Sequence, residues 1–499
     1  MTTRKLVAID LGAESGRAVV GQLDGNQLTL QEVHRFRNGP VRVAGHLHWN
    51  VLRIHDEILS GIAQAARQFG EIASVGVDTW GVDFGLLDRN GTLIGNPYHY
   101  RDHRTDGAMD KLFQRVPRAD VFAATGIQFM QLNTLYQLYA MALEQSPALD
   151  IADKLLMMPD LINYWLTGEK VSEFTDATTT QFYDTRNNTW AFGLLDRLGL
   201  PAKIMPQVIQ PATELGPLLP AVADQLGLRG VKVIAPACHD TGSAVAAVPA
   251  SVEHVVHNAY AYISSGTWSL MGVVTPAPFI TDVTRDLNFT NEGGVGGTIR
   301  LLKNIAGLWL VQECRRAWAR AGDELSYDVM TSMAQQAAPF TAFVDPDHHS
   351  FLAPDDMPAA MQAFCQATGQ PVPSERGELV RVALESLACK YRVTLESLEK
   401  ILGYRLEAIH IVGGGSQNRL LCQFAADVCG RPVYAGPVEA TALGNVLAQA
   451  IATGQCASWA QAREIVRVSF PPKAYEPRDA QRAAWDQAYT RFHQVLKKE

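Results

Sequence analysis

One short polar segment of the chain carries side chains suited to proton transfer. The sequence APACHDTGSAVAAV places His239-Asp240-Thr241-Gly242 between an apolar run and a stretch of small residues. An aspartate where a strand gives way to a helix is kept anionic and oriented, as a general base must be. The same position also suits a plain N-cap. Position alone therefore leaves Asp240 open to either role or to both.

A second segment is suited to binding phosphate. Residues Lys5 to Leu23, KLVAIDLGAESGRAVVGQL, combine an apolar run, Asp10, a small-residue turn and a returning apolar run, which predicts a β-hairpin. A small polar turn offers backbone N–H groups and hydroxyls to an anion. The pattern returns from Asn258 to Val274, NAYAYISSGTWSLMGVV. Two such hairpins predict two related domains that hold phosphates between them.

Three more segments have polar or glycine-rich character. Thr79 to Asp83, TWGVD, follows a buried strand, and ligands bind at such strand ends in open α/β sheets. Gly413-Gly414-Gly415 follows the strand Ala408 to Val412, and its lack of side chains lets a flat ring or a phosphate approach the backbone. The loop Tyr100 to Thr105, YRDHRT, is strongly polar, and composition alone favours a solvated turn with local salt bridges.

Size and composition limit the class of protein. A chain of 499 residues is expected to form two domains of roughly 200–250 residues. The net charge of −8 excludes a basic surface for nucleic acid, and no apolar run approaches the roughly 18 residues of a membrane helix. The start MTTRKLVAID leaves no room for a signal peptide, so we expect a cytoplasmic protein. Seven cysteines without a C-x-x-C pair argue against a disulfide framework or a zinc site.

The helices and strands around these segments are predicted from the spacing of apolar residues and from the Gly, Pro and Asn residues that end or cap them. Asn50 is expected to cap a helix that ends at Gly70, and Asn90-Gly91 predicts a hairpin between Phe84–Leu87 and Leu93–Ile94. A helix that contains Leu308 and Trp318 is expected to be followed by a Pro-rich irregular region through Pro373. A long helix from Gly377 to Leu402 and a surface helix from Tyr475 to Glu499 are expected further on. The apolar face of the first helix comprises Leu52, Ile54, Ile58, Leu59, Ile62 and Phe69. The predicted domains span residues 1–248, 249–455 and, as a helical extension, 456–499.

No Walker A motif, G-x-S-x-G elbow or G-x-G-x-x-G fingerprint occurs in the chain. The sequence instead resembles the sugar kinases of the actin, hexokinase and Hsp70 superfamily, and within it the FGGY carbohydrate kinase family. The resemblance extends from about Lys5 to about Thr453. It rests on the motifs IDLGAESGR, VDTWGVDFGLLD, YRDHRT, MPDLINYWLTG, HDTGSAV, YISSGTWSLMG, TNEGG, LKNIAGLWL and HIVGGGSQN.

The resemblance implies a fold, an activity and a set of site residues. The fold would be α/β, with two actin/hexokinase-like (ribonuclease H-like) domains facing each other across a cleft. The reaction would be ATP-dependent phosphorylation of L-rhamnulose at its C1 hydroxyl, in rhamnose degradation, with Asp240 as base and Asp10 holding Mg²⁺. The residues implied for the nucleotide are Ala13, Glu14, Ser15, Gly16, Arg17, Thr267, Asn304, Gln312 and Gly414, and those for the sugar are Gly81, His239, Asp240 and Thr241. Glu14 departs from the small neutral residue common at its position, and we expect it to point away from phosphate.

Two alternatives stay open on sequence. One is a kinase for a related ketose such as L-fuculose or L-xylulose, because residues alone do not fix the stereochemistry at each hydroxyl. The other is an actin- or Hsp70-like ATPase that acts on a protein partner. The polar TWGVD, YRDHRT and HDTG segments argue against the second, since they suit a polyhydroxylated substrate. No nucleic-acid or membrane partner is expected, and the sequence does not distinguish a monomer from a homo-oligomer.

Overall fold

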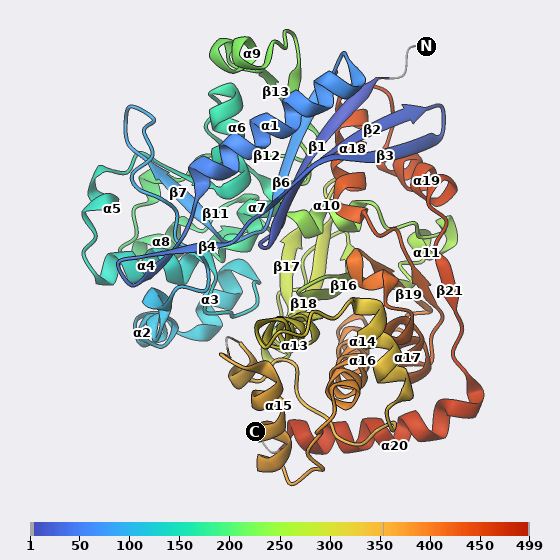
Figure 1. Ribbon diagram of the computed structural model, residues 1–499. Coiled ribbons are helices and arrows are strands. Elements are labelled where there is room, and N and C mark those ends of the chain that lie inside the picture. Colours follow the sequence, from blue (N-terminus) through green and yellow to red (C-terminus); the bar gives the residue numbers. More distant parts are fainter. Residues whose placement is uncertain (1–3, 353, 498–499) are drawn as a thin grey trace. The chain divides into compact units, whose positions relative to one another are not determined.

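The computed structural model describes residues 4–352 and 354–497 (Figure 1). The chain divides into two compact units. Unit 1 comprises Met1–Ala247, Val274–Leu301 and Ala440–Ser469, and unit 2 comprises Val248–Val273, Leu302–Glu439 and Phe470–Glu499. Each unit therefore draws on separate stretches of chain. The division into domains 1–248, 249–455 and 456–499 stays a prediction, because compact units and sequence domains need not share boundaries.

The core of unit 1 is a six-stranded sheet with the strand order β13-β14-β6-β1-β2-β3. Strands β1 and β2 pair as the predicted antiparallel hairpin, whereas β1 and β14 both run parallel to β6. All six residues of β6 are buried, as expected for a central strand. The strands are β1 (Lys5–Leu11), β2 (Ser15–Asp24), β3 (Gln27–Arg37), β6 (Ser74–Thr79), β13 (Thr213–Pro217) and β14 (Lys232–Ala235).

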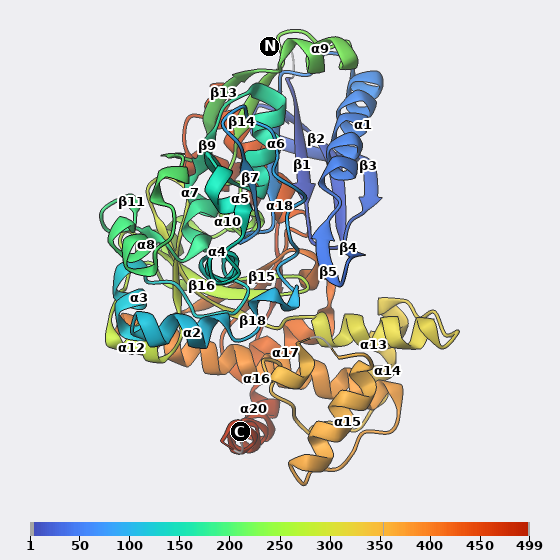
Figure 2. The same cartoon turned by 90° about the vertical axis from the view of Figure 1, so that its left-hand side faces the viewer.

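Helices α1 (Val51–Phe69) and α18 (Ala440–Ala452) cover opposite faces of this sheet (Figure 1 and Figure 2). A Cβ on Gly61 of α1 would meet Ala18, and a Cβ on Gly21 would meet Val446 of α18. Residues 18 and 21 of β2 have opposite parity and therefore point to opposite faces. The sheet is thus a buried layer between two helices, which keeps its strand ends at fixed positions.

Helix α1 begins as predicted, because the Asn50 side chain accepts a hydrogen bond from Arg53 N at 3.3 Å, and it ends at Gly70 with φ 76°. Its expected apolar face was wrong at one position. Leu52 is 67% exposed, since it precedes the buried Ile54 by two residues and so lies about 200° away around the helix.

The rest of unit 1 consists of short helices and strands around a second core. The predicted hairpin after Phe84 is only partly formed. The chain reverses at Asp88, but β7 (Phe84–Leu87) pairs with β8 (Lys154–Met157), and a single bridge joins Leu87 to Leu93. The four residues of β8 offer β7 a full-length apolar partner that Leu93–Ile94 cannot match.

The other elements are β4 (Pro40–Val43), β5 (His46–Trp49), α2 (Ala108–Arg115), α3 (Arg118–Thr125), α4 (Thr134–Leu143), α5 (Pro147–Ile151), α6 (Met158–Thr167), β9 (Val171–Glu173), α7 (Phe174–Ala177), β10 (Tyr183–Asp184), β11 (Thr189–Trp190), α8 (Phe192–Leu198), β12 (Gln207–Ile209), α9 (Pro220–Leu226), α10 (Asp240–Ala246), α12 (Asp282–Asp286), β17 (Thr290–Gly293), β18 (Ile299–Ile305) and α19 (Trp459–Ser469).

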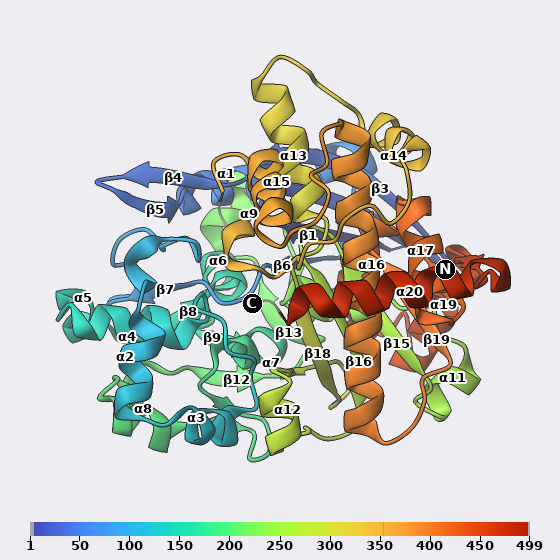
Figure 3. The same ribbon diagram turned by 90° about the horizontal axis from the view of Figure 1, so that it is seen from below.

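Unit 2 contains the second predicted hairpin, in which β15 (Tyr260–Ser265) pairs antiparallel with β16 (Ser269–Thr275). Its strands follow the order β16-β15-β19-β20-β21, and β15 runs parallel to β19 (Ala408–Val412). The helix α16 (Arg376–Leu402) confirms the predicted long helix and buries an apolar face that includes Leu379, Leu387 and Leu395, and α20 lies across it (Figure 3). The remaining elements are α11 (Val252–Val256), α13 (Trp309–Arg320), α14 (Tyr327–Gln336), α15 (Met357–Ala367), α17 (Arg419–Cys429), β20 (Val433–Ala435), β21 (Lys473–Tyr475) and α20 (Asp479–Leu496).

Two expectations for unit 2 were wrong in detail. The region expected to be irregular up to Pro373 contains α14 and α15, capped by Ser326 and Asp356, whose side chains accept hydrogen bonds from the first turns. The tail helix begins at Asp479 rather than Tyr475, because Tyr475 pairs with Val433 in the sheet; residues 498–499 lie outside the described part of the chain. None of the helices in the described ranges is long and apolar enough to span a membrane.

Candidate active site

The carboxyl ends of three neighbouring strands of unit 1 bring the predicted catalytic segments together. Asp10 of β1 lies opposite Asp78 of β6 in the parallel register. A further bridge joins Thr79 to His239, and Thr79 N donates to Cys238 O at 2.8 Å. Asp10, the TWGVD loop and the HDTG segment therefore meet at one edge of the sheet, where open α/β sheets bind ligands.

Asp240 is the first residue of α10, and its N-cap position belongs to His239, which makes no side-chain cap. The predicted N-cap role of Asp240 was therefore wrong by one residue. Its Oδ1 atom accepts hydrogen bonds from Thr241 N at 2.5 Å and Thr241 Oγ1 at 3.1 Å. Burial raises the pKa of Asp240 above its usual range, although solvent still reaches 31% of the side chain. Asp240 is thus an oriented and accessible carboxyl group of increased proton affinity.

The predicted nucleotide residues Ala13 to Arg17 lie in the turn between β1 and β2 and in the first three residues of β2. Gly12 N donates to Ser15 O at 2.9 Å, which closes the turn, and Glu14 is exposed. Gly16 is required by packing, because a Cβ there would lie 2.2 Å from the ring of Phe36.

Arg17 makes a contact that the sequence analysis did not predict. Its Nη2 and Nε atoms bond to Asp10 Oδ2 at 2.7 and 3.0 Å. Asp10, the residue predicted to hold a metal, is therefore part of an ion pair that uses Oδ2.

The predicted sugar residue Gly81 lies in a tightly packed loop. A Cβ at Gly81 would lie 3.0 Å from Thr179, and Val82 N donates to Thr179 Oγ1 at 3.1 Å. The next carboxylate, Asp83, is fully buried and accepts hydrogen bonds from four donors. These are Trp49 Nε1 at 2.6 Å, Trp80 Nε1 at 3.1 Å, Tyr100 N at 3.2 Å and Gln137 Nε2 at 2.8 Å. Asp83 thus joins the TWGVD loop to the start of YRDHRT.

The YRDHRT loop is not the solvated turn that composition favours. Asp102 is 3% exposed and accepts hydrogen bonds from Leu47 N at 2.6 Å and Arg104 N at 3.0 Å. The Arg104 guanidinium bonds to Gln137 and lies 4.1 Å from the ring centre of Tyr98. Asp102 and Arg104 are therefore paired inside unit 1 with residues distant in sequence.

Asp83 should make stability depend on pH. Burial raises its pKa from 3.8 to about 6, so the fold favours the protonated acid. This stabilisation is fully present below about pH 4 and is lost as the pH rises through 6. The free energy of unfolding should therefore fall, relative to Asp83→Asn, by up to about 3 kcal/mol between pH 4 and 7. Denaturant titrations at several pH values measure this difference; parallel curves for the two proteins would contradict it. Exposed Asp196→Asn serves as control.

Three buried acids beneath the HDTG segment were missed by the sequence analysis. Glu173 Oε2 accepts hydrogen bonds from Cys238 N at 2.9 Å and Thr175 N at 3.0 Å, and Thr175 Oγ1 accepts one from His239 N at 3.1 Å. Burial raises the pKa of Glu173 to about 7, and it also raises the pKa values of Asp160 and Asp176. Glu173 and Thr175 therefore hold the backbone that leads to Asp240. The threonine-rich sequence SEFTDATTT was the available signal, since its hydroxyls bond to the acids.

Unit 2 gathers its own predicted residues around the β15–β16 turn. Leu308 N and Trp309 N donate to Gly266 O and Thr267 O at 3.1 and 3.2 Å, which places the start of α13, and with it Gln312, beside the turn. A Cβ on Gly415 would lie 2.0 Å from Ser265 Oγ, whereas one on Gly414 would meet no atom within 4 Å. The glycine triplet therefore packs against the turn through Gly415 and faces open space at Gly414. Asn304 lies near the end of β18, in the part of this strand that belongs to unit 2.

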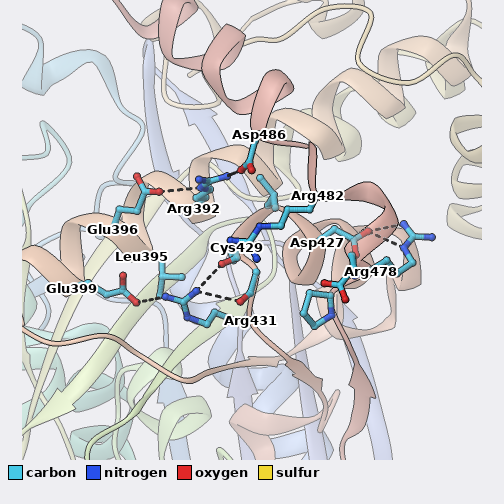
Figure 4. A pocket seen from close by; sticks show the side chains of 14 residues that line it. Arg392, Leu395, Glu396, Glu399, Asp427, Cys429, Arg431, Arg478, Arg482 and Asp486 are labelled. Atoms are coloured by element: carbon cyan, nitrogen blue, oxygen red, sulfur yellow. Dashed lines mark hydrogen bonds and ion pairs between the residues drawn. The ribbon is translucent and has the colours of Figure 1, made fainter. Parts of the chain in front are cut away.

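A pocket of about 140 Å³ in unit 2 contains none of the predicted site residues (Figure 4). Three of its arginines are paired: Arg392 with Glu396 and Asp486, Arg431 with Glu399, and Arg478 with Asp427, at 2.6–2.9 Å. The pocket is the gap within an ion-pair network that joins α16, α17 and α20.

Comparisons with known proteins identify the family to which the chain belongs. The family models of the FGGY family of carbohydrate kinases match residues 5–247 for the N-terminal domain and 261–453 for the C-terminal domain. The chain is 45% identical to a rhamnulokinase from Bacteroides thetaiotaomicron, over 98% of this chain and 99% of that protein. It is 39% identical to a rhamnulokinase from Bacillus subtilis, over 97% of each.

Solved structures show the same fold at low sequence identity. A gluconate kinase from Lactobacillus acidophilus has a TM-score of 0.81 at 16% identity and covers 100% of this chain and 98% of its own. A xylulose kinase from the same organism has a TM-score of 0.80 at 16% identity, with coverages of 99% and 98%. The predicted two-domain α/β kinase fold is thereby confirmed.

Proposed function

Since the chain belongs to the FGGY family of carbohydrate kinases, we propose that it transfers the γ-phosphoryl group of ATP to the C1 hydroxyl of L-rhamnulose. The products are L-rhamnulose 1-phosphate and ADP, in rhamnose degradation. One observation carries this proposal: the similarity to rhamnulokinases extends over nearly the whole length of both chains. The placement of Asp240 at a ligand-binding strand end supports the chemistry.

Asp240 acts as the general base in this proposal. The C1 hydroxyl gives its proton to the Asp240 carboxylate while its oxygen forms a bond to the γ-phosphorus. The bond from that phosphorus to the β,γ-bridging oxygen breaks, ADP leaves with the electron pair, and Asp240 later returns the proton to solvent. Positioning and charge compensation supply most of the rate in phosphoryl transfer. Gly81, His239 and Thr241 of unit 1 orient the sugar.

Asp10 is the residue we propose for Mg²⁺, which compensates phosphate charge when bound. Mg²⁺ in kinases needs only one or two carboxylates besides phosphate and water. The side chains fit, because Arg17 Nη2 and Nε bond to Oδ2 of Asp10, and the neighbouring Asp78 Oδ1 is buried without a hydrogen-bond partner. Asp10→Asn should raise the Mg²⁺ concentration for half-maximal activity by about tenfold or more. An unchanged Mg²⁺ titration would remove this role.

We propose that the nucleotide contacts comprise Ala13 to Arg17 in unit 1 and Thr267, Asn304, Gln312 and Gly414 in unit 2. Gly414→Ala tests this, because its methyl group enters open space in the apoprotein. The variant should keep its stability and its KM for sugar, while its KM for ATP rises about tenfold, which corresponds to about 1.4 kcal/mol of binding.

The neighbouring glycine provides a matched control for that test. In Gly415→Ala the new Cβ would collide with Ser265, so this variant should lose about 1–3 kcal/mol of folding free energy. An unchanged KM for ATP in Gly414→Ala would show that Gly414 does not contact the nucleotide.

The proposed reaction is tested by ADP release across a ketose panel. L-Rhamnulose should give the highest kcat/KM, and L-fuculose or L-xylulose in first place would replace it as substrate. ADP release that is independent of any sugar would favour an ATPase. We also propose a cytoplasmic location, because all seven cysteines are buried free thiols.

A further inference from the structure

A polar cluster without an assigned role lies next to His239 in unit 1. Its members come from the TNEGG motif and the strand that follows it. Glu292 Oε2 lies 3.3 Å from His239 Nδ1, and Arg300 Nη2 lies 3.2 Å from the same nitrogen and 3.2 Å from Glu292 Oε2. The side chains of Arg300, Glu292 and His239 are 0%, 6% and 9% exposed. Three ionisable groups are therefore buried in mutual contact beside the catalytic segment.

The charges of this cluster balance each other. The Arg300 guanidinium is a permanent cation whose Nε donates to Gly293 O at 2.7 Å. Burying such a cation alone is costly, so it needs an anion in contact. Glu292 is that anion: although burial opposes ionisation, neighbouring positive charge, that of Arg300 included, helps to lower the pKa of Glu292 below its usual value. The Glu292–Arg300 ion pair thus contacts the Nδ1 edge of the His239 imidazole.

The hydrogen bond from Arg300 determines which ring nitrogen carries the proton. A guanidinium can only donate, so His239 Nδ1 must accept with its lone pair. The proton of the neutral imidazole then lies on Nε2. That nitrogen faces Asp240 Oδ1 at 3.4 Å. The buried pair therefore keeps the imidazole N–H on the edge of the ring that lies near the catalytic carboxyl group.

This N–H group distinguishes the two oxygens of Asp240. Oδ1 already accepts from the backbone and the hydroxyl of Thr241. His239 Nε2 lies 3.4 Å from the same oxygen, at ion-pair distance, so Oδ2 is the oxygen left to receive a proton. We infer that Glu292 and Arg300 are positioning residues that hold His239 in its Nε2–H tautomer and thereby present Oδ2 of Asp240 to the sugar hydroxyl. This inference rests on the proposed function for its catalytic consequence, but the tautomer is a property of the protein alone.

Nitrogen-15 NMR of protein labelled at histidine measures the tautomer directly, because protonated and unprotonated ring nitrogens differ widely in chemical shift. The His239 resonances are assigned from their loss in His239→Asn. The wild-type protein should show the Nε2–H form, and a Nδ1–H form would overturn the inference without any variant at the pair.

Arg300→Met removes the donor to Nδ1. The proton should then move to Nδ1, opposite Glu292, and kcat should fall about 10- to 100-fold with an unchanged KM for ATP. The double variant Glu292→Gln/Arg300→Met removes both charges. If the two residues act together, its fold-decrease in kcat should be at least about tenfold smaller than the product of the fold-decreases in Glu292→Gln and Arg300→Met. An Nε2–H tautomer with kcat within twofold of wild type in Arg300→Met would overturn the inference.

Glu385→Gln is the matched control, since Glu385 is also a buried carboxylate paired with an arginine, Arg381, at 2.7 Å in unit 2. It should lower stability without changing kcat or the His239 signal. If Arg300→Met does not fold, the tautomer of His239 in the wild-type protein still decides the question. A wild-type protein that phosphorylates no ketose would end the proposed function, while the tautomer would still be read from its spectrum.

Discussion

Asp240→Asn should lower kcat by about 10²–10⁴-fold, because an amide cannot take up the proton of the attacking hydroxyl. The substitution keeps the size of the side chain and an oxygen that can accept from Thr241, so the HDTG turn should keep its shape. ADP release at saturating L-rhamnulose and ATP measures kcat, and calorimetry measures ATP affinity, which should change little. The loss should therefore appear in turnover rather than in binding.

A surface aspartate provides the control for this variant. Asp224 is 71% exposed and lies 4.0 Å from Arg229, so Asp224→Asn should leave kcat unchanged. If Asp240→Asn turned over within tenfold of wild type, the general-base assignment would be wrong.

Gly444→Ala should disrupt the same site through packing. A Cβ at Gly444 of α18 would lie 1.9 Å from Ser243 O, a backbone atom of α10 that cannot move alone. The helix that begins with Asp240 must therefore shift. We expect a loss of about 1–3 kcal/mol or more in unfolding free energy and a fall in kcat of about 100-fold, since a displacement of about 1 Å has that effect on catalysis.

Gly193→Ala is the corresponding control within a helix. Gly193 is exposed in α8, and a Cβ there meets no atom within 4 Å, so alanine should stabilise the protein by up to about 1 kcal/mol. Thermal unfolding and kcat of both variants separate the effect of contact from that of helix propensity. Wild-type kcat in Gly444→Ala would show that α10 tolerates a shift.

Local patterns made much of the fold and part of the site predictable. Both hairpins could be found because apolar runs end in small polar turns, and the strands before Thr79 and Gly413 could be found because short apolar stretches of that kind fit only a buried sheet. The same reasoning located Asp240 at a strand end. These features depend on neighbours in sequence, so the sequence alone contains the signal.

The other features depend on partners that are distant in the chain. YRDHRT has the composition of a surface loop, yet Asp102 is buried because Leu47 N donates to it. Glu173 supports the backbone of Cys238 across 65 residues, and Arg300 reaches His239 across 61. The ion pair of Arg17 with Asp10 joins two residues that seven positions of chain separate but strand pairing brings together. Such contacts follow from the fold and leave no local pattern.

The seven buried cysteines give this molecule a built-in reporter of unfolding. Burial raises the pKa of every one of these thiols, so almost no reactive thiolate is present while the core is closed. Cys238 and Cys456 belong to unit 1, and the other five belong to unit 2. A short pulse of iodoacetamide during denaturation therefore adds two mass increments when unit 1 opens and five when unit 2 opens. Intact-mass spectra can thus follow the opening of each unit separately in the unmodified sequence.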